Sequence, residues 1–319
     1  MDARLGEMRL SRRCLLGAVA GGAGALGVLA ASFAVLPARA AEPVKVVATF
    51  SVLGDLVKEV GGALAVVDLL VGPNADMHAF QPTPAESRKL LGAKLVVVNG
   101  LGLEGWSDRL IKASGYAGPI AVASNGVKAM AKPDDDHDHD HGHGHDDPHA
   151  WQSVAGAKVY VANIRDALAA ADPGNKAAYA RNADDYLARL DALDREIVAA
   201  YADIPKDKRR VITAHQAFRY YGAAYGLDFR GAKGVGDEAE PTARDIAELI
   251  RQIKKDKIRA LFVENISGHR LLDRIAKETD AKVGGTLYSD ALSDAAGPAP
   301  TYIEMMRTNT KAIAAALRG

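Results

Sequence analysis

The chain has 319 residues, a length compatible with two domains of average size. Hydrophobic residues make up 48% and charged residues 25% of it, which is ordinary for a soluble globular protein. Its 40 basic residues balance 40 acidic ones, and no basic block follows the amino terminus, which argues against nucleic acid as a partner. With Cys14 as its one cysteine, the chain cannot form an internal disulfide.

The first 40 residues have the pattern of an export signal. A segment with four arginines leads into the uncharged run 14–38, and the run ends in Ala38-Arg39-Ala40, the small-x-small pattern that export peptidases cut. We expect residues 1–40 to be a signal peptide cleaved near Ala40. Residues 11–16 resemble a twin-arginine signal, although Leu15 stands where phenylalanine is common; the general secretory route and an uncleaved membrane anchor stay open as alternatives.

Cleavage would change the mature chain in two ways. It removes five basic and two acidic residues, which leaves a mildly acidic chain with 35 basic against 38 acidic residues. It also removes Cys14, so any metal site must use nitrogen and oxygen ligands. No cysteine stands at the cleavage point to carry a lipid anchor, and we therefore expect a soluble protein exported to the periplasm.

The first part of the mature chain alternates apolar strands with helices. The helix that begins at Thr83 has a capping box, Thr83-Pro84-Ala85-Glu86, with proline at its first position. Such alternation predicts a parallel sheet covered on both faces. The expected strands are Val44–Thr49, Ala65–Val71, Leu95–Val98 and Ile120–Ala123, and the other expected helices are Val52–Gly61 and Trp106–Ala113.

A tract rich in histidine and aspartate follows this part. Its sixteen residues, 134–149, contain six histidines and seven aspartates but no lysine or arginine, so the tract cannot build an apolar core. Imidazoles and carboxylates are the ligands that zinc prefers. We expect five of the histidines to be weak auxiliary metal ligands, with a solvated acidic loop as the alternative: His137, His139, His141, His143 and His145.

Two helices come next, and the second is unusually long. The helix predicted for residues 153–170 is ended by Asp172-Pro173-Gly174, and from Asn175 to about Asp203 there is neither proline nor glycine. A helix of that length measures about 40 Å, enough to link two lobes. We therefore expect an N-terminal lobe (41–171) that carries the His/Asp-rich loop 134–147, a linking helix (172–204) and a C-terminal lobe (205–319).

The alternation of strands and helices resumes after Pro205. The expected fold class is α/β, with two lobes, each a mainly parallel sheet flanked by helices, joined by one long rigid helix. The strands expected in the second lobe are Arg210–Thr213, Ala260–Val263 and Val283–Tyr288, and the helices are Ala217–Tyr225, one capped by Thr242, Arg270–Thr279 and Tyr302–Leu317.

Four metal-capable residues fall at the ends of these elements. His78 follows strand 65–71, His149 precedes a helix, His215 follows strand 210–213, and Asp290 follows strand 283–288. In open α/β sheets, ligands bind outside the carboxyl ends of the strands, so two facing lobes could bring the four together. Three imidazoles and one carboxylate favour zinc, whereas manganese prefers more oxygen. Taken singly, each residue could instead be a loop or capping residue.

Other polar residues nearby receive plainer interpretations. We expect His269 to be a surface residue and Glu264, at a strand end, to have a structural hydrogen-bonding role. A zinc hydrolase needs an open position for water, which a fourth protein ligand would close, and neither HExxH nor Gly-x-Ser-x-Gly occurs. We therefore expect no enzyme.

Residues 44–317 resemble the zinc- and manganese-binding solute-binding proteins of ABC transporters. The resemblance implies two α/β lobes with one metal ion between them, held by His78, His149, His215 and Asp290. Manganese-type relatives commonly carry glutamate at the third position, and a His-rich insertion is typical of zinc-type members. The cysteine pair of some zinc relatives is absent. The matching stretches are Asp76–Phe80, Asp147–Trp151, Thr213–Tyr221, Glu238–Asp245, Leu261–Glu264 and Gly285–Leu292.

The resemblance also implies a function. We expect a monomer that captures Zn²⁺, with Mn²⁺ less favoured, and presents it to an ABC permease in the cytoplasmic membrane, with a periplasmic metal donor as a further partner. The alternatives are a manganese-binding solute-binding protein, a periplasmic zinc buffer without a transporter and a surface-attachment protein.

Overall fold

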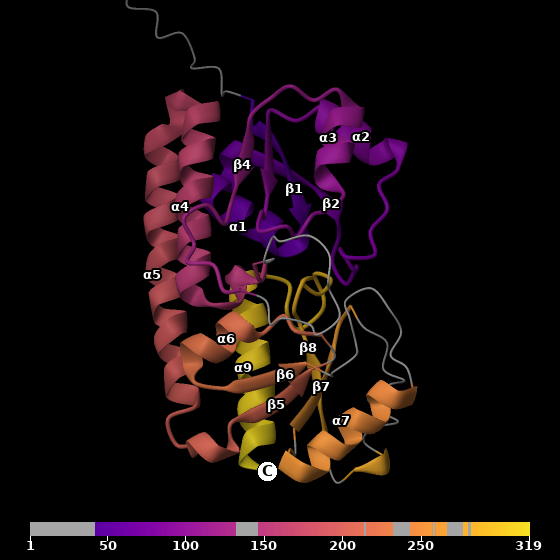
Figure 1. The fold of residues 1–319 in the computed structure, drawn as a ribbon. Coiled ribbons are helices and arrows are strands. Elements are labelled where there is room, and N and C mark those ends of the chain that lie inside the picture. The colour runs from indigo at the N-terminus through magenta and orange to yellow at the C-terminus, as the bar shows by residue number, and fades with distance from the viewer. Residues whose placement is uncertain are drawn as a thin grey trace, which may run out of the picture. The chain divides into compact units, whose positions relative to one another are not determined.

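The computed structural model describes residues 42–131, 146–213, 215–231, 243–256, 258, 260–266, 277–279 and 282–319. In this part of the chain, two four-stranded parallel sheets are flanked by helices (Figure 1), which confirms the expected fold class. Among the described helices, none combines the length and the apolar character that a membrane span requires.

Several sequence predictions lie outside the described residues. These are the signal peptide 1–40, the auxiliary histidines of residues 137–145, His269, the cap at Thr242 and most of the helix predicted for 270–279.

The N-terminal lobe is built on a sheet with the strand order β2-β1-β3-β4, in which all neighbours are parallel. β3 and all of β1 except Lys45 are buried, because the two strands consist mostly of apolar residues, many of them valine. The predicted capping box begins α2: the Thr83 side chain accepts from Ala85 N, and the Glu86 side chain accepts from Thr83 N. The elements are β1 (Val44–Phe50), α1 (Ser51–Gly61), η1 (Gly62–Leu64), β2 (Ala65–Val71), α2 (Pro84–Leu91), β3 (Leu95–Val98), α3 (Ser107–Ser114), β4 (Ile120–Val122), η2 (Ala150–Gln152) and α4 (Val154–Ala171).

The C-terminal lobe repeats this strand order as β6-β5-β7-β8, again with all strands parallel. β6 was not predicted, because Asp228-Phe229-Arg230-Gly231 is short and half charged. Such a strand is stable at a sheet edge, where it pairs with β5 alone. The elements are η4 (Lys206–Lys208), β5 (Arg210–Thr213), α6 (Arg219–Tyr225), β6 (Asp228–Gly231), α7 (Ala243–Asp256), β7 (Ala260–Glu264), β8 (Lys282–Leu287) and α9 (Tyr302–Arg318).

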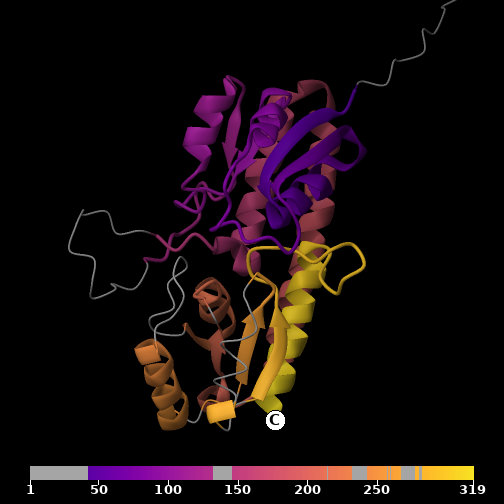
Figure 2. The same ribbon diagram turned by 90° about the vertical axis from the view of Figure 1, so that its right-hand side faces the viewer.

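The long helix α5 (Lys176–Ala200) follows the short turn η3 (Pro173–Asn175) and touches both lobes (Figures 1 and 2). Its 25 residues correspond to about 38 Å. Arg189 pairs with Glu59 of α1, with 2.7 Å between Nη1 and Oε2. Glu196 pairs with Arg307 of α9 at 2.8 Å. The buried face of α5 follows helical spacing: Tyr179, Ala183, Tyr186, Leu190, Leu193 and Ile197.

Loops at the carboxyl ends of the two sheets are tied together by hydrogen bonds. Leu292 N donates to Ser51 Oγ at 2.9 Å, and Asn74 N donates to Leu292 O at 2.9 Å. At the start of α9, Tyr302 N donates to Asp55 of α1 at 2.7 Å. Strand ends from both halves of the chain therefore meet in one region.

Candidate metal centre

Three imidazoles and one carboxylate converge where the two lobes meet. Each of His78, His149, His215 and Asp290 offers one ligand atom, and these atoms all lie within 4.8 Å of one another. His78 Nε2 is 2.9 Å and His215 Nε2 is 3.3 Å from Asp290 Oδ2. The Nε2 atoms of His149 and His215 are 3.2 Å apart. A tetrahedral zinc ion with bonds of about 2.0 Å separates its ligand atoms by about 3.3 Å, so the spacing of this cluster suits one small divalent ion.

His78 is presented by the loop that follows β2. Asp76 Oδ1 accepts from His78 N at 2.8 Å, which forms a tight turn just before the ring. Met77 is fully buried, and its carbonyl accepts from Trp106 Nε1 at 3.2 Å. The two anchored residues directly before His78 therefore restrict where its ring lies.

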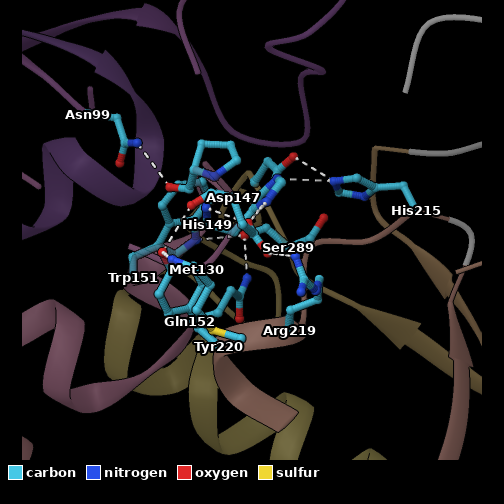
Figure 3. Close-up of polar contacts among 12 residues, drawn as sticks. Asn99, Met130, Asp147, His149, Trp151, Gln152, His215, Arg219, Tyr220 and Ser289 are labelled. Atoms are coloured by element: carbon cyan, nitrogen blue, oxygen red, sulfur yellow. Dashed lines mark hydrogen bonds and ion pairs between the residues drawn. The ribbon is translucent and has the colours of Figure 1, made fainter. Parts of the chain in front are cut away.

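His149 stands at the entrance to η2 and is oriented by Asp147. Asp147 Oδ1 accepts from His149 N at 3.0 Å and lies 2.8 Å from His149 Nδ1. Because a carboxylate only accepts, Nδ1 carries the hydrogen and Nε2 is left for a metal ion. Asn99 Nδ2 donates to Pro148 O at 3.0 Å and so fixes the backbone between the two residues (Figure 3).

Gly156 lets α4 begin directly beneath this turn. A Cβ atom at Gly156 would lie 2.0 Å from Ala150 O, closer than any side chain can approach a carbonyl. Ser153 caps the helix by accepting from Gly156 N at 3.0 Å. The first turn of α4 and the residue after His149 are therefore in direct contact.

His215 follows β5 and is oriented by Glu264 at the end of β7, the neighbouring strand. Glu264 Oε1 accepts from His215 N at 2.9 Å, and Oε2 lies 2.5 Å from His215 Nδ1. Glu264 is fully buried. We expected Glu264 to have a structural hydrogen-bonding role, and its partner is the ring of His215. As in His149, the Nε2 atom of His215 is left to face the other candidate ligands.

Asp290 lies in the turn after β8 and is fully buried. The preceding carbonyl, Ser289 O, accepts from Trp151 Nε1 at 3.0 Å and from Gln152 Nε2 at 2.8 Å. Asp290 Oδ1 has no hydrogen-bond partner among the described residues; the nearest ring nitrogen recorded for it, His149 Nε2, is 3.6 Å away. A buried carboxylate oxygen in this condition is suited to bind a cation.

The charges of the cluster shift its proton equilibria. Burial would lower the pKa of His149, but Asp290 and Asp147 outweigh it and raise that pKa to about 9. Burial likewise opposes the effect of Glu264 and Asp290 on His215, whose pKa they raise well above its ordinary value. Burial would raise the pKa of Asp290, yet the two rings hold it well below its usual range. The carboxylates thus favour positive charge here, carried either by protons or by a metal ion.

Comparison with known proteins decides the family. A family model described as the periplasmic zinc-uptake complex component A matches residues 46–316. The chain belongs to this family. Its members are the periplasmic metal-binding solute-binding proteins of ABC transporters, not enzymes, which agrees with the prediction from the sequence.

Members of this solute-binding protein family with known ligands do not share one metal. The iron-binding protein YfeA of Yersinia pestis is 32% identical over 278 residues, with 87% of this chain and 88% of YfeA covered. The manganese-binding lipoprotein MntA of Halalkalibacterium halodurans is 30% identical over 268 residues, which are 84% of this chain and 86% of MntA. Family membership alone therefore does not select the ion.

Solved structures of the family have the same fold. The periplasmic zinc-binding protein TroA of Treponema pallidum superposes with a TM-score of 0.78 at 27% identity, covering 86% of this chain and 99% of TroA. The manganese-bound periplasmic metal-binding protein of Candidatus Liberibacter asiaticus gives a TM-score of 0.76 at 28% identity, with the same coverage of 86% and 99%.

The four residues selected from the sequence all come together in the structure, whereas the surrounding residues were only partly anticipated. Asp147 was not assigned a role, although its spacing two residues before His149 repeats that of Asp76 and His78. Trp151, which holds the Asp290 turn, gave no signal, because its contact spans 138 residues of sequence.

Proposed function

We propose that this solute-binding protein captures Zn²⁺ in the periplasm between His78, His149, His215 and Asp290 and delivers it to an ABC permease. The observation that carries the proposal is the convergence of three imidazole nitrogens and one carboxylate oxygen within 4.8 Å. A four-donor set rich in nitrogen favours zinc, because manganese takes more oxygen ligands.

The hydrogen bonds around the rings support the same ion. Asp147 and Glu264 each bind the Nδ1 side of a candidate ligand, at 2.8 Å and 2.5 Å. Zinc-bound histidines usually donate their second ring hydrogen to a carboxylate or carbonyl, which fixes the tautomer and increases the basicity of the ligating nitrogen. In His149 and His215, Nε2 is therefore the ring nitrogen that is free to bind a metal ion.

Manganese capture is the second candidate function, and one observation favours it. Asp290 Oδ1 is buried without a hydrogen-bond partner among the described residues, so both oxygens of this carboxylate could bind one ion. A bidentate Asp290 would give three nitrogens and two oxygens, a set closer to the preference of manganese. Relatives that are named as iron-binding and manganese-binding proteins also support this alternative.

Competitive titration of the mature protein, starting at residue 41, with Zn²⁺ and Mn²⁺ tests the choice of ion. We expect one tight zinc site and manganese binding weaker by orders of magnitude. We expect Asp290→Asn and His215→Ala to lose the tight site, while the matched control Asp203→Asn, at an exposed ion pair with Arg318, keeps it. Tighter binding of manganese than of zinc would overturn the choice of ion, and wild-type affinity in Asp290→Asn would overturn the site.

The route to the periplasm is part of this proposal. Residues 1–40 would direct export and be removed after Ala40, and residues 137–145 would supply auxiliary histidines that raise the local zinc concentration. The amino-terminal sequence of the exported protein tests the first point, because it should begin at Ala41.

A further inference from the structure

The two chain segments that flank residues 132–145 lie side by side. Ala131 and Asp146 form an antiparallel bridge, and Asp147 N donates to Met130 O at 2.7 Å. The second of these segments runs straight into His149, two residues after Asp147. The position of the bridge therefore determines where this candidate ligand begins.

Two consecutive residues at the start of α6, Arg219 and Tyr220, hold both segments from the other lobe. The Tyr220 hydroxyl accepts from Met130 N at 2.9 Å and donates to Asp147 O at 3.0 Å. Arg219 Nη1 donates to Ala131 O at 2.6 Å and lies 3.7 Å from Asp147 Oδ2 (Figure 3). We refer to Arg219 and Tyr220 as the α6 clamp.

The clamp reaches the metal centre through a single residue, Asp147, whose backbone carbonyl faces Tyr220 and whose carboxylate faces Arg219. Asp147 is 2% exposed, and its Oδ1 binds both the backbone N and the ring Nδ1 of His149. Asp147 Oδ2 is buried and has no hydrogen-bond partner among the described residues, and the Arg219 guanidinium is the cation that faces it. Without that cation, the buried carboxylate would be free to turn away, and the ring of His149 would lose the group that fixes its tautomer.

The clamp also connects two candidate ligands of different lobes. His215 lies four residues before Arg219, so the segment that presents His215 continues into the helix that holds the support of His149. The two Nε2 atoms are 3.2 Å apart. Displacing α6 would change both ligands together.

We propose that Arg219 and Tyr220 are positioning residues of the metal centre, which act through Asp147 to aim His149 Nε2 at the ion. This inference rests on the proposed function, because it assumes that His149 binds the ion. Removing the support of a metal-bound histidine typically weakens metal binding by about 10- to 100-fold, and we expect the clamp to contribute on that scale although neither residue touches the ion.

The test uses the mature protein with Arg219→Gln, Tyr220→Phe and the double variant. Zinc affinity is measured by competitive titration, and the visible absorption of the Co²⁺-loaded protein reports the geometry of the ligands. We expect about a tenfold loss of zinc affinity in each single variant and a larger loss in the double variant. The cobalt bands should shift at saturation, and Arg219→Lys should restore affinity in part, because it returns the charge.

Matched controls separate positioning from general stability. Arg189→Gln removes an arginine–carboxylate pair between α5 and α1, and Tyr179→Phe removes a hydroxyl that donates to Asp172 at 2.9 Å. Both should keep wild-type affinity and cobalt spectrum. Wild-type zinc affinity in the double variant would overturn the proposal. So would weaker binding with an unchanged cobalt spectrum and no rescue by Arg219→Lys, because that combination indicates a merely structural role.

His149→Ala distinguishes this inference from the proposed function beneath it. If His149→Ala loses the tight site while the clamp variants keep wild-type zinc affinity, only the proposed role of the clamp is overturned. Wild-type binding in His149→Ala would overturn the proposed site itself, and the clamp with it.

Discussion

At the scale of single residues, the pKa of His149 determines how the proposed metal site should respond to pH, because an ion that binds this ring must displace its proton. A histidine in water is half protonated near pH 6.5. Here Asp290 and Asp147 more than offset burial and raise the pKa of His149 to about 9. Below that value the ring is protonated in the metal-free protein, and a protonated ring cannot bind metal.

Zinc affinity should therefore fall as the pH drops through about 9, well above the range of an isolated histidine. Each proton displaced by the ion lowers the apparent affinity by up to about tenfold per pH unit. Competitive titrations between pH 6.5 and 9.5 would measure this slope, and calorimetry in buffers of different ionisation enthalpy would count the protons released. A zinc affinity that does not change over that range would contradict the prediction.

Glu264 supports His215 with both of its carboxylate oxygens, and one substitution tests this support. In Glu264→Gln, the side chain keeps its shape and one acceptor oxygen for His215. It loses the negative charge, and an NH2 group that only donates replaces one of the two oxygens that face His215 N at 2.9 Å and Nδ1 at 2.5 Å. We expect zinc affinity to fall by about 10- to 100-fold. Glu196→Gln, at the exposed pair with Arg307, is the control and should bind zinc normally. Equal affinities of the two variants would show that the charge of Glu264 is not used.

The four candidate ligands could be selected from the sequence because each stands next to a predictable element. The residues that orient them could not, since their partners are distant in the chain. Tyr220 bonds to Asp147 across 73 residues, and Glu264 bonds to His215 across 49. Only the two Asp-x-His spacings, Asp76 with His78 and Asp147 with His149, are local, and they could have been recognised beforehand.

At the scale of secondary-structure elements, the start of α4 is tightly constrained. Gly156 allows the helix to contact the Ala150 carbonyl, because any Cβ there would lie 2.0 Å from that oxygen. The turn that carries His149 and the helix therefore cannot separate without loss of packing.

Gly156→Ala should destabilise the metal-free protein by about 1–3 kcal/mol, the usual cost of overpacking, and should weaken zinc binding by displacing His149. Thermal unfolding and zinc titration measure the two effects. Gly174→Ala is a matched control, since the nearest atom to its added Cβ would be 3.8 Å away. Wild-type stability and zinc affinity in Gly156→Ala would contradict the prediction, because the start of α4 could then move away from the Ala150 carbonyl at no cost.

Deleting residues 134–145 tests the role of the auxiliary histidines. The flanking Ala131 and Asp146 already form a bridge, so the shortened connection can close without moving Asp147. We expect the total zinc bound per protein to fall while the tight affinity stays unchanged. Metal analysis together with competitive titration gives both values. An unchanged zinc stoichiometry would remove the auxiliary role.

Which elements could be predicted depended on their composition. β1 and β3 were recognisable as apolar runs buried on both faces, and α5 as a long stretch without proline or glycine. β6 was missed because a charged edge strand has no such signature.

At the scale of the whole described fold, two sheets of the same strand order direct their carboxyl ends to one region. This arrangement brings together residues as distant as His78 and Asp290, which are 212 positions apart. Leu292 N bonded to Ser51 and Tyr302 N bonded to Asp55 tie the lobes together in addition to α5. The four candidate ligands are thus brought together by contacts that do not require an ion.

Joint binding of one ion by both lobes is tested most directly by a crystal structure of the zinc-loaded mature protein with anomalous diffraction at the zinc edge. We predict a single strong anomalous peak within about 2.0–2.2 Å of the three Nε2 atoms of His78, His149 and His215 and of an Asp290 oxygen. A zinc-loaded protein whose anomalous peak lies elsewhere, or whose ion contacts ligands of one lobe only, would contradict the account.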